Sequence, residues 1–587
     1  MTSERQIVEC VPNFSEGRDM SIVKQITDEI ESVDGVSLLN VDPGEATNRT
    51  VVTFVGEPQA VVEAAFRAAK KAGEVIDMRK HHGAHPRMGA TDVLPLIPVS
   101  GITLEECAQL ARDLARRMAN EAGIPCYCYE AAAFRPERKN LAVCRAGEYE
   151  AIEEKLTVAD KQPDFMPDGF KPEELKTGAQ LSPVAARVLQ AGCTAVGARD
   201  FLIAVNYNLN TTSTRRANAI AFDVREKGRP MREGNPITGT IIRDEQGQPV
   251  MQPGTLKCTK AIGWYIDEYG IAQVSMNMTN LGVTPLHVAF DEVCRCAQNR
   301  GIRVTGTEIV GLVPKRALID AGKYFLEKQH RSVGIPEEDI VKIAVKSMGL
   351  DDLKPFNPRE KVIEYLMEDM AAQQGKLAQL TVKAFAHETS RESPAPGGGT
   401  IAAYMGALGA ALGTMVANLS AHKAGWDDRW AEFSQWAAMG QDMLARLMDL
   451  VDEDTEAFNA IMAAFALPKK SDEERAVRDA AIEQATRYAA EVPLRTMHAA
   501  TQVFVICRAM AHEGNPASVS DAGVGALAAR AAVLGAGLNV KINAAQLKDR
   551  ALADRLVAEA EGLVKKAIEA EREIMETVES IIQKETL

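Results

Sequence analysis

The chain has no cysteine pair with the spacing of a zinc site. Its ten cysteines are scattered, and the two closest pairs, Cys126/Cys128 and Cys294/Cys296, are both C-x-C. This spacing does not match the C-x2-C pairs of structural zinc sites. The cysteines are therefore expected to be reduced thiols in a reducing compartment.

The chain also lacks a long basic run and an apolar N-terminal segment. Its formal charge is −14 at pH 7, and no basic stretch offsets it. This charge argues against a general nucleic-acid-binding protein but allows an anionic small substrate, which needs only a local basic pocket. The first residues, MTSERQIVECVPNF, carry charge where a signal peptide needs an apolar core, so no export signal is expected.

The first part of the chain predicts a cycle of strands and helices. A length of 587 residues is enough for three or four domains. Apolar spacing predicts strands and helices in the order strand 6–13, helix 20–32, strands 36–41 and 50–56, helix 58–76, strand 93–99, helix 104–122 and strand 125–130. The first six elements follow the β-α-β-β-α-β order of the split βαβ plan.

A second cycle of the same kind begins near Asp200. Strands are predicted at FLIAVNYNL, TKAIGWYID and IAQVSMNMTN, with helices at 215–227 and 287–298 and a short strand at 303–306. We therefore expect two ferredoxin-like subdomains that face one another, residues 1–180 and residues 181–366. Helices after Lys315 are expected to close the second.

The composition changes after about Glu368. The segment MAAQQGKLAQL favours helix but has no large core residue, so residues 367–378 are predicted to be a linker. From Leu377 onward no strand pattern is found, and helical stretches alternate with the breaks PAPGGG, LPKKSDEE and EGNPAS. Residues 379–587 are therefore predicted to form an all-α helical bundle after the α+β half.

One predicted helix of the bundle, Thr400–Ser420, is long and apolar enough to span a membrane. Its Gly406, Gly409 and Gly413 lie on one face, which suits close helix packing in a membrane, in a soluble bundle or in a dimer. Basic flanks are missing and few other apolar runs accompany it, so packing within a bundle is favoured.

Three of the nine histidines lie within five residues, at His81, His82 and His85. They fall in a loop between a predicted helix and a predicted strand. A metal site, general acid–base chemistry near neutral pH, and a solvated turn are all open. Breaks at Gly83 and Pro86 disfavour the helix that would bring two histidines onto one face, so acid–base chemistry is the favoured role.

Asp42 and the pair Asn48-Arg49 form a second group of polar residues. Asp42 ends the predicted strand SLLNVD, and sites often gather at strand ends. Its carboxylate could orient an imidazole from a neighbouring loop, or it could satisfy its own backbone in an Asx turn. Asp92 would join the histidines only if they bind a metal.

The acidic run LMDLVDEDTEAF contains one carboxylate in phase with an apolar stripe, Asp454. The stripe has helical spacing and consists of Leu447, Val451, Phe458, Ile461 and Phe465. A carboxyl in an apolar seam is expected to have a raised pKa, which suits proton transfer. The alternative is a polar residue facing a water-filled gap.

The turn PAPGGGT precedes the Thr400 helix. Its Gly397 and Gly398 could present backbone amides to an anion at a helix N-terminus, or could simply form a tight turn. No Lys-Ser/Thr follows, so it is not a P-loop. Asp521 and Asn539 are polar residues in a run of small ones and are candidates for lining the same cavity as Asp454.

The chain resembles the bifunctional formiminotransferase-cyclodeaminases over nearly its whole length. The resemblance rests on IVECVPNFSEGR, NVDPGEATNRTVVTFVG, HPRMGATDVLPLIPV, GARDFLIAVNYNL, AIGWYIDE, PAPGGGT and LVDEDTEAF, in that order. It implies a first half that transfers a formimino group from N-formimino-L-glutamate to tetrahydrofolate. It implies a second, helical half that closes 5-formiminotetrahydrofolate to 5,10-methenyltetrahydrofolate with loss of ammonia.

The resemblance also implies roles for particular residues. In the first half it places the catalytic histidine at His85, with Asp42 as its companion, and in the second half it places the catalytic carboxylate at Asp454. Arg49 or Arg87 is expected to hold a substrate carboxylate. Folate contacts are expected at Gly197, Ala198, Arg199, Lys257 and Lys260, near a segment, Asp168–Gly197, that is longer than usual for the family. His81 and His82 are interpreted as incidental.

The implied partners are N-formimino-L-glutamate and polyglutamylated tetrahydrofolate as co-substrate, with no metal, nucleotide or nucleic acid. The resemblance further implies a cytoplasmic enzyme of histidine degradation and one-carbon metabolism, without a transmembrane segment, that assembles as dimers in a ring. An alternative keeps formimino or formyl transfer only and makes the helical half a folate-binding, oligomerising module. An apolar residue at position 454 would suit that module better than Asp454.

Overall fold

The computed structural model describes residues 6–44, 48–82, 86–176, 181–234, 239–372, 377–392 and 395–586. The chain separates into two compact units. The first comprises residues 1–317 and 349–370, and the second comprises residues 318–348 and 371–587.

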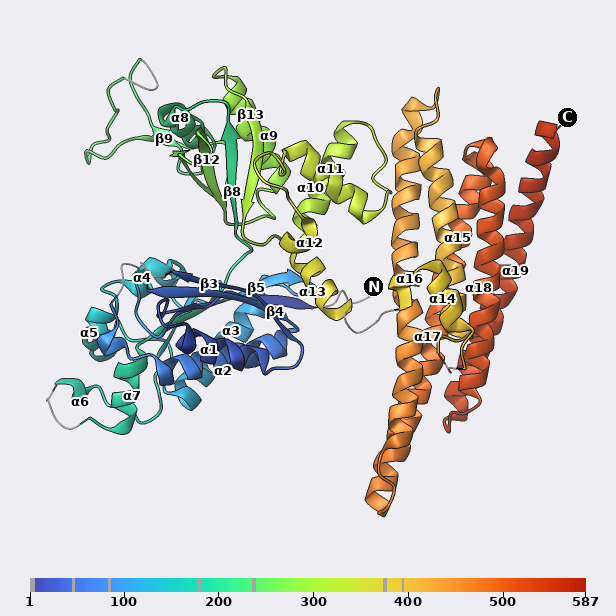
Figure 1. The fold of residues 1–587 in the computed structure, drawn as a ribbon, viewed down its shortest axis with the longest axis horizontal. Coiled ribbons are helices and arrows are strands. Elements are labelled where there is room, and N and C mark those ends of the chain that lie inside the picture. Colours follow the sequence, from blue (N-terminus) through green and yellow to red (C-terminus); the bar gives the residue numbers. More distant parts are fainter. Residues whose placement is uncertain are drawn as a thin grey trace. The chain divides into compact units, whose positions relative to one another are not determined.

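A mixed sheet of seven strands forms the first subdomain (Figure 1). Its strands are β1 (Ile7–Cys10), β2 (Asn13–Phe14), β3 (Val36–Gly44), β4 (Arg49–Gly56), β5 (Thr91–Ser100), β6 (Cys126–Glu130) and β7 (Thr194–Ala198). Strand β4 pairs with β3 on one side and with β1 and β2 on the other. Strands β1 and β2 also pair with β5, and β5, β7 and β6 follow in parallel. The strand order therefore places β3 and β4 in the same sheet as β5.

Three helices, α1 (Met20–Glu31), α2 (Pro58–Val75) and α3 (Leu104–Ala122), pack together against one face of this sheet (Figure 1). The ends of α3 follow from its sequence. Thr103 and Glu106 form a capping box at the start, and Gly123 takes a left-handed conformation after the end. Apolar side chains of the helices and of alternate strand positions bury a common core.

A smaller core lies around Tyr127, Tyr129, Val93 and Ala195 and includes short segments after β6. These segments contain α4 (Leu141–Arg145), α5 (Ile152–Thr157), α6 (Glu173–Lys176) and α7 (Pro183–Ala191). Strand β7 completes the sheet after them. The first subdomain thus runs to about residue 198, whereas the boundary was predicted at residue 180. The prediction fell short because the prolines and glycines of this stretch do not indicate that β7 pairs with β5.

The second subdomain has a four-stranded antiparallel sheet in the order β11-β12-β8-β13. Its main elements are β8 (Ile203–Leu209), α8 (Thr214–Val224), β11 (Thr259–Ile266), β12 (Ile271–Met278), α9 (Leu286–Gln298) and β13 (Val304–Val310). A small hairpin of β9 (Arg229–Pro230) and β10 (Met251–Gln252) precedes β11, and α12 (Pro358–Lys361) and α13 (Ile363–Ala372) come last. The strand order along the chain agrees with the predicted second cycle.

The second unit is helical, as predicted. Its long helices are α15 (Gly398–Ala421), α16 (Trp430–Ala466), α17 (Asp472–Glu513), α18 (Val519–Ala544) and α19 (Arg550–Thr586), with the shorter α14 (Val382–Thr389) before them. Small residues let α15 and α18 approach closely. A Cβ atom at Gly409 would lie 2.8 Å from the carbonyl oxygen of Gly525, so a larger side chain does not fit there at this helix spacing.

Residues 318–348 belong to this second unit, although they were predicted to close the second subdomain. They hold α11 (Glu337–Met348) and most of α10 (Lys315–Lys328). The loop between these helices is held by the bundle, where Ser434 Oγ accepts a hydrogen bond from the Val333 amide at 3.0 Å and Asn418 Nδ2 donates to the Gly334 carbonyl at 2.7 Å.

Two helical segments of the bundle, Gly398–Ala421 and Pro516–Ala544, are long and apolar enough to cross a membrane by length and composition. In the most apolar window of each, 61% and 50% of the residues are buried inside the protein. The three glycines of α15 face Leu447, Gly525 and Ile506, so they serve close helix packing within the bundle.

Candidate active sites

His81 is buried and bridges two other parts of the first subdomain. Its Nε2 lies 3.0 Å from the carbonyl oxygen of Asn48, and the Nε of Arg87 donates to its Nδ1 at 3.3 Å. A carbonyl only accepts and a guanidinium only donates, so the imidazole is neutral and carries its proton on Nε2. The pKa of His81 is lowered, mainly by burial, and the positive charge of Arg87 lowers it further. His81, which the sequence interpretation took as incidental, therefore links the backbone of Asn48 to the side chain of Arg87.

Asn48, directly before β4, makes hydrogen bonds to His82 and to Gly17. Its Nδ2 donates to the carbonyl of His82 at 3.0 Å, and its Oδ1 accepts from the Gly17 amide at 3.1 Å. Its φ of 49° lies in the left-handed region, which asparagine tolerates better than most residues. His85, the predicted catalytic residue, lies outside the described residues, so its role stays a prediction. The His82 carbonyl shortly before it is anchored by Asn48, and Arg87 shortly after it is anchored by ion pairs.

Arg87 is engaged by two glutamates of its own chain. Its two terminal nitrogens lie 2.8 and 2.7 Å from the two carboxylate oxygens of Glu150, and Nη1 is 3.1 Å from Glu148. These charge-assisted bonds, first those to Glu150, raise the pKa of Arg87. A cavity of about 480 Å³ opens beside them, lined by His82, Arg87, Gly147, Glu148 and Glu150.

Asp42, Arg49, Asp92 and Arg145 form a charged group near this segment. Asp42 is exposed near the end of β3, and Arg49 begins β4. Burial is the main cause that lowers the pKa of Arg49; the carboxylates of Asp92 and Asp42 oppose the shift and Arg145 adds to it. Asp92, only 1% exposed, accepts from the Met88 amide at 3.0 Å and from Arg145 Nη2 at 2.6 Å. No motif in the sequence singles out Arg145.

The predicted folate contacts fall in different environments. Gly197 lies under the ring of Tyr129, where a Cβ atom would be 2.5 Å from a ring carbon, so only glycine fits. Ala198 is buried in the helix-side core. Burial raises the pKa of the Glu130 carboxyl, and the positive charges of Arg199 and Lys260 partly oppose this shift. The structure thus groups Arg199 with Lys260.

Lys257 is exposed, and its carbonyl accepts from Thr284. No side-chain contact links it to the other predicted folate residues in the described part of the chain.

Glu9, on β1, is a buried carboxyl that is not among the predicted site residues. It is 4% exposed, and within the described residues no hydrogen bond or ion pair reaches its side chain. Burial raises its pKa to about 7, and Arg199 opposes the shift. A glutamate between Val8 and Cys10 in an otherwise apolar strand was the signal that could have identified it.

Asp454, on α16, packs against the first residues of α15, which follow the glycine turn. Thr400 Oγ1 donates to its Oδ2 at 2.9 Å, and a Cβ atom at Gly399 would lie 2.2 Å from its Oδ1. Burial raises the pKa of Asp454, and the hydrogen bonds from Thr400 oppose that shift. Asn539 joins the group, since a Cβ atom at Gly398 would lie 3.4 Å from its Nδ2. The carboxyl, the helix N-terminus behind Gly397 and an amide side chain thus meet at one place.

Two expectations for the bundle differ from the structure. Asp521 is in the first turn of α18, eighteen residues before Asn539, which at 1.5 Å per residue is about 27 Å along the helix. The structure does not bring Asp521 to Asp454. Leu447 and Val451 are buried as the stripe predicted, but Phe465 is 47% exposed near the end of α16.

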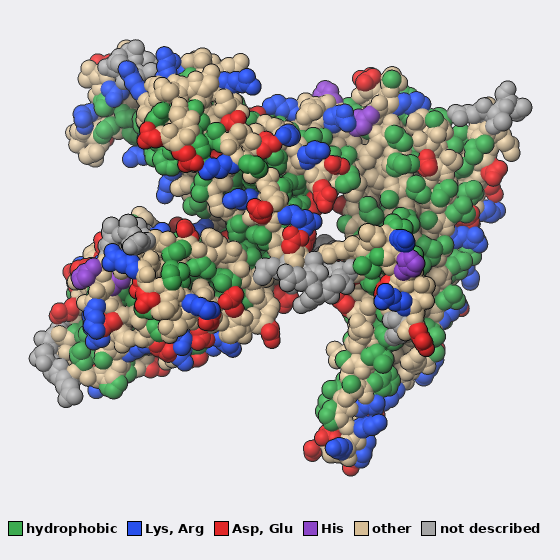
Figure 2. Space-filling view, in the orientation of Figure 1, with side chains coloured by type: hydrophobic (Ala, Val, Ile, Leu, Met, Phe, Trp, Pro, Cys, Tyr) green, Lys and Arg blue, Asp and Glu red, His purple; other side chains and the backbone are tan. Residues whose placement is uncertain are grey.

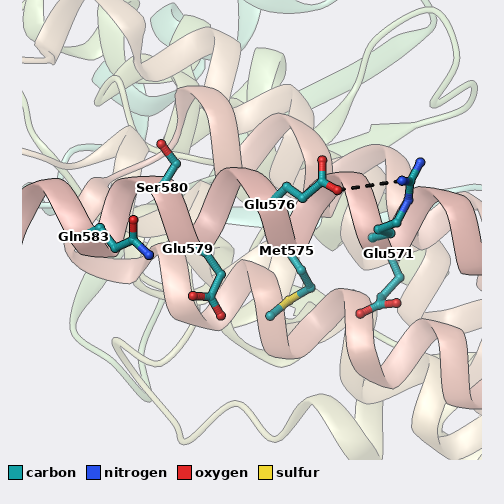
Figure 3. A pocket seen from close by; sticks show the side chains of 7 residues that line it. Glu571, Met575, Glu576, Glu579, Ser580 and Gln583 are labelled. Carbon is teal, nitrogen blue, oxygen red and sulfur yellow. Dashed lines mark ion pairs between the residues drawn. The ribbon is translucent and has the colours of Figure 1, made fainter.

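A separate hollow of about 480 Å³ lies along α19 (Figure 3). Its lining is Glu571, Arg572, Met575, Glu576, Glu579, Ser580 and Gln583, and Arg572 pairs with Glu576 at 3.9 Å. It shares no residue with the Asp454 group. Among the described residues, no three His, Cys, Asp or Glu side chains gather as a metal site requires.

Three family models match the chain in sequence order. The one described as "Formiminotransferase domain, N-terminal subdomain" matches residues 7–199, "Formiminotransferase domain" matches 204–368, and "Formiminotransferase-cyclodeaminase" matches 381–562. The first match ends at the sheet boundary that β7 defines.

Named relatives cover the whole chain and each half. The formimidoyltransferase-cyclodeaminase of Mus musculus is 41% identical over 544 residues, 93% of each chain. The glutamate formimidoyltransferase of Streptococcus pyogenes serotype M1 is 39% identical over 322 residues, 55% of this chain and 94% of the relative. The methenyltetrahydrofolate cyclohydrolase of Methylorubrum extorquens is 39% identical over 200 residues, 34% of this chain and 96% of the relative.

An α+β half and a helical half, each with an ionisable group whose pKa is shifted by burial, are typical of an enzyme with two reaction centres. The relatives of each half are themselves enzymes named for separate reactions. The chain belongs to the formimidoyltransferase-cyclodeaminase family. The resemblance seen in the sequence motifs is confirmed.

Proposed function

We propose that the protein is a folate-dependent bifunctional enzyme. The first half transfers the formimino group of N-formimino-L-glutamate to nitrogen 5 of tetrahydrofolate and releases glutamate. The second half closes 5-formiminotetrahydrofolate to 5,10-methenyltetrahydrofolate and releases ammonia. The support is the family membership together with relatives that match each half separately.

The observation that carries the second activity is the environment of Asp454. Ring closure requires nitrogen 10 to attack the formimino carbon and lose its proton, while the amidine nitrogen gains a proton and leaves as ammonia. A carboxyl whose pKa is raised by burial can exchange protons nearer neutral pH than a solvated aspartate. Thr400 fixes the position of one oxygen, and Gly399 leaves room for the carboxyl against the helix start.

In the first half, nitrogen 5 of the folate attacks the amidine carbon and loses a proton. The bond to the glutamate nitrogen then breaks, and that nitrogen gains a proton. His85 with Asp42 is the proposed acid–base pair, because a neutral imidazole can accept the first proton and donate the second. On either side of His85 in the sequence, Asn48 anchors the His82 carbonyl and Glu150 anchors the Arg87 side chain.

A stoichiometric assay of the unaltered protein tests both activities. The protein is mixed with N-formimino-L-glutamate and tetrahydrofolate, and glutamate, ammonia and methenyltetrahydrofolate absorbance are followed together. Equal amounts of the three products are expected. Glutamate without ammonia would leave a transferase whose helical half does not close the ring, and no product at all would refute the proposal.

We further propose that the protein assembles with copies of itself through the bundle. Leu408, Met415 and Leu419 are exposed at helical spacing on α15, and Val524, Leu527 and Leu538 are exposed on α18. The two helices pack side by side, since a Cβ atom at Gly525 would contact Leu412 at 3.5 Å. Hydrophobic side chains gather on the visible face of the bundle in Figure 2. Apolar surface of this extent favours a covered interface.

The finer expectations belong to the same proposal. Ferredoxin-like subdomains are supported by the order β11-β12-β8-β13 and by the corresponding order β3-β4-β1-β5 in the first sheet. Polyglutamylated folate as co-substrate, a role in histidine degradation and one-carbon supply, a cytoplasmic location and a ring of dimers follow from the family resemblance.

A further inference from the structure

Asp454 supplies the helix cap that α15 lacks in its own sequence. The N-cap residue of α15 is Gly397, which makes no side-chain cap, and the first turn contains no acidic residue. The hydroxyl and the backbone amide of Thr400 both bond to the Asp454 carboxylate on α16. A carboxylate at a helix N-terminus accepts from amides that have no partner within the helix. Thr400 therefore holds Asp454 through two of its groups.

A second threonine extends this arrangement. Thr455, next to Asp454 on α16, has its Oγ1 3.3 Å from the Oγ1 of Thr400. A hydroxyl has one proton to donate, and Thr400 gives it to Oδ2 of Asp454 at 2.9 Å. The hydroxyl oxygen of Thr400 can then only accept, so Thr455 is the donor in the second bond. The three side chains thus form a chain of hydrogen bonds that runs from Thr455 through Thr400 to the carboxylate.

The two carboxylate oxygens of Asp454 differ in their surroundings. Oδ2 accepts from the fully buried Thr400, whereas Asp454 itself is only partly buried. No other side chain donates to Asp454 within the described residues. Oδ1 is therefore the oxygen without a side-chain partner, and it lies at the start of α15, where a Cβ atom at Gly399 would be 2.2 Å away.

The ionisable residues of the neighbouring turns have partners of their own or face solvent. These residues are Asp452, Glu453 and Glu456 on α16 and Tyr488 and Arg495 on α17. Helix α15 has Tyr404 as its only ionisable residue. Burial raises the pKa of Asp454, and the two hydrogen bonds from Thr400 oppose that shift. Thr400 is thus the group through which the protein adjusts the proton affinity of this carboxyl.

We propose that Thr400 and Thr455 are positioning residues for ring closure, which keep Oδ2 of Asp454 occupied so that Oδ1 exchanges the proton with the folate. As nitrogen 10 bonds to the carbon of the protonated formimino group, its N–H bond breaks and Oδ1 takes the proton. Oδ1 then returns the proton to the former amidine nitrogen, whose bond to carbon breaks to release ammonia. Asp454 ends ionised, as it began. The inference rests on the proposed cyclodeaminase activity and gives two hydroxyl groups a role in it.

The pH dependence of ring closure tests this assignment in the full-length protein. Supplied 5-formiminotetrahydrofolate is the substrate, and kcat/KM is measured from methenyltetrahydrofolate absorbance across the acid and neutral range. The reaction needs an ionised Asp454, so kcat/KM falls on the acid side of the pKa of its carboxyl. Thr400→Val removes the hydroxyl bond that lowers this pKa. The acid limb of the profile should therefore move to higher pH by about one unit.

Three other variants show whether the hydroxyl groups are responsible. Thr400→Ser keeps the hydroxyl and should leave the acid limb in place. Thr455→Val removes the donor to Thr400, which weakens the next bond in the chain, so the limb should move in the same direction by a smaller amount. Thr414→Val is the matched control, since Thr414 is a buried threonine of the same helix whose hydroxyl donates to the Ala410 carbonyl at 2.8 Å. It should leave the limb unmoved.

The outcomes separate this inference from the proposed function. The position of the acid limb does not depend on the fraction of protein that is folded. Ring closure with an unmoved limb in Thr400→Val overturns the inference alone, and if that variant does not fold, an unmoved limb in Thr455→Val overturns it. A shift in Thr414→Val as large as that in Thr400→Val also overturns it. Absence of ring closure by the unaltered protein would overturn the proposed cyclodeaminase function and this inference with it.

Discussion

Replacing Glu9 by glutamine should make the first subdomain more stable at alkaline pH and leave it unchanged at acid pH. Burial raises the pKa of Glu9 from 4.5 in the unfolded chain to about 7 in the folded protein. Below pH 4.5 the carboxyl is protonated in both states and costs no stability. As the pH rises from 4.5 to 7, the unfolded chain ionises first, so the folded state progressively loses stability.

The size of the effect follows from the difference between the two pKa values. At 1.36 kcal/mol per unit, the shift of the Glu9 pKa to about 7 corresponds to roughly 3 kcal/mol, fully expressed above pH 7. Glutamine has the same shape and no charge. The variant should therefore gain up to roughly 3 kcal/mol at pH 8 and almost nothing at pH 4.5.

Amide hydrogen exchange on the intact protein measures this difference locally. Peptides that cover β1 and β4 should exchange up to about two orders of magnitude more slowly in Glu9→Gln than in the unaltered protein at pH 8. At pH 4.5 the two proteins should exchange alike. An exposed carboxylate on α1, Glu31, provides the control variant Glu31→Gln, which should show no such pH dependence. Equal protection of Glu9→Gln and the unaltered protein at pH 8 would refute the reasoning.

Three further changes probe other parts of the account. His81→Leu removes the hydrogen-bond partner of the Asn48 carbonyl and of the Arg87 Nε. Formimino transfer should therefore fall about 10- to 100-fold while ring closure persists. Equal transfer rates in the variant and the unaltered protein would contradict a structural role of His81. Gly399→Ala places a methyl group 2.2 Å from Asp454 Oδ1, so the rate of ring closure should fall at least about 10-fold in the absorbance assay. The control variant Gly562→Ala has open space around the added methyl group and should close the ring at the unaltered rate. Leu408→Glu should lower the oligomer mass in light scattering, and an unchanged mass would move the interface elsewhere.

Elements defined by local periodicity were predictable from the sequence. The β-α-β-β-α-β cycles and the helical second half follow from apolar spacing within single segments. Asp454 was found in the same way, because the stripe that isolates it belongs to one helix. The stripe failed at Phe465, which is 47% exposed and has the Arg478 guanidinium 5.5 Å from its ring centroid. The end of α16 and the start of α17 extend beyond the other helices of the bundle (Figure 1).

Contacts between distant segments were not predictable from the sequence. Arg145 lies 53 residues from Asp92, and α4 is too short to show a period. Asp521 and Asn539 look equivalent in a run of small residues, but only Asn539 lies where α15 begins, since α18 extends away from Asp454 toward Asp521. His81 looked incidental because its role depends on Asn48, which lies in a different turn.

The central claim is that two separate sites catalyse two successive reactions, and Asp454→Asn tests it most directly. The variant keeps the hydrogen bond from Thr400 possible but removes the ionisable group. With N-formimino-L-glutamate and tetrahydrofolate as substrates, glutamate should be released at the rate of the unaltered protein. Methenyltetrahydrofolate formation should fall at least about 100-fold, so that 5-formiminotetrahydrofolate accumulates. Ring closure at the normal rate in Asp454→Asn would contradict the account.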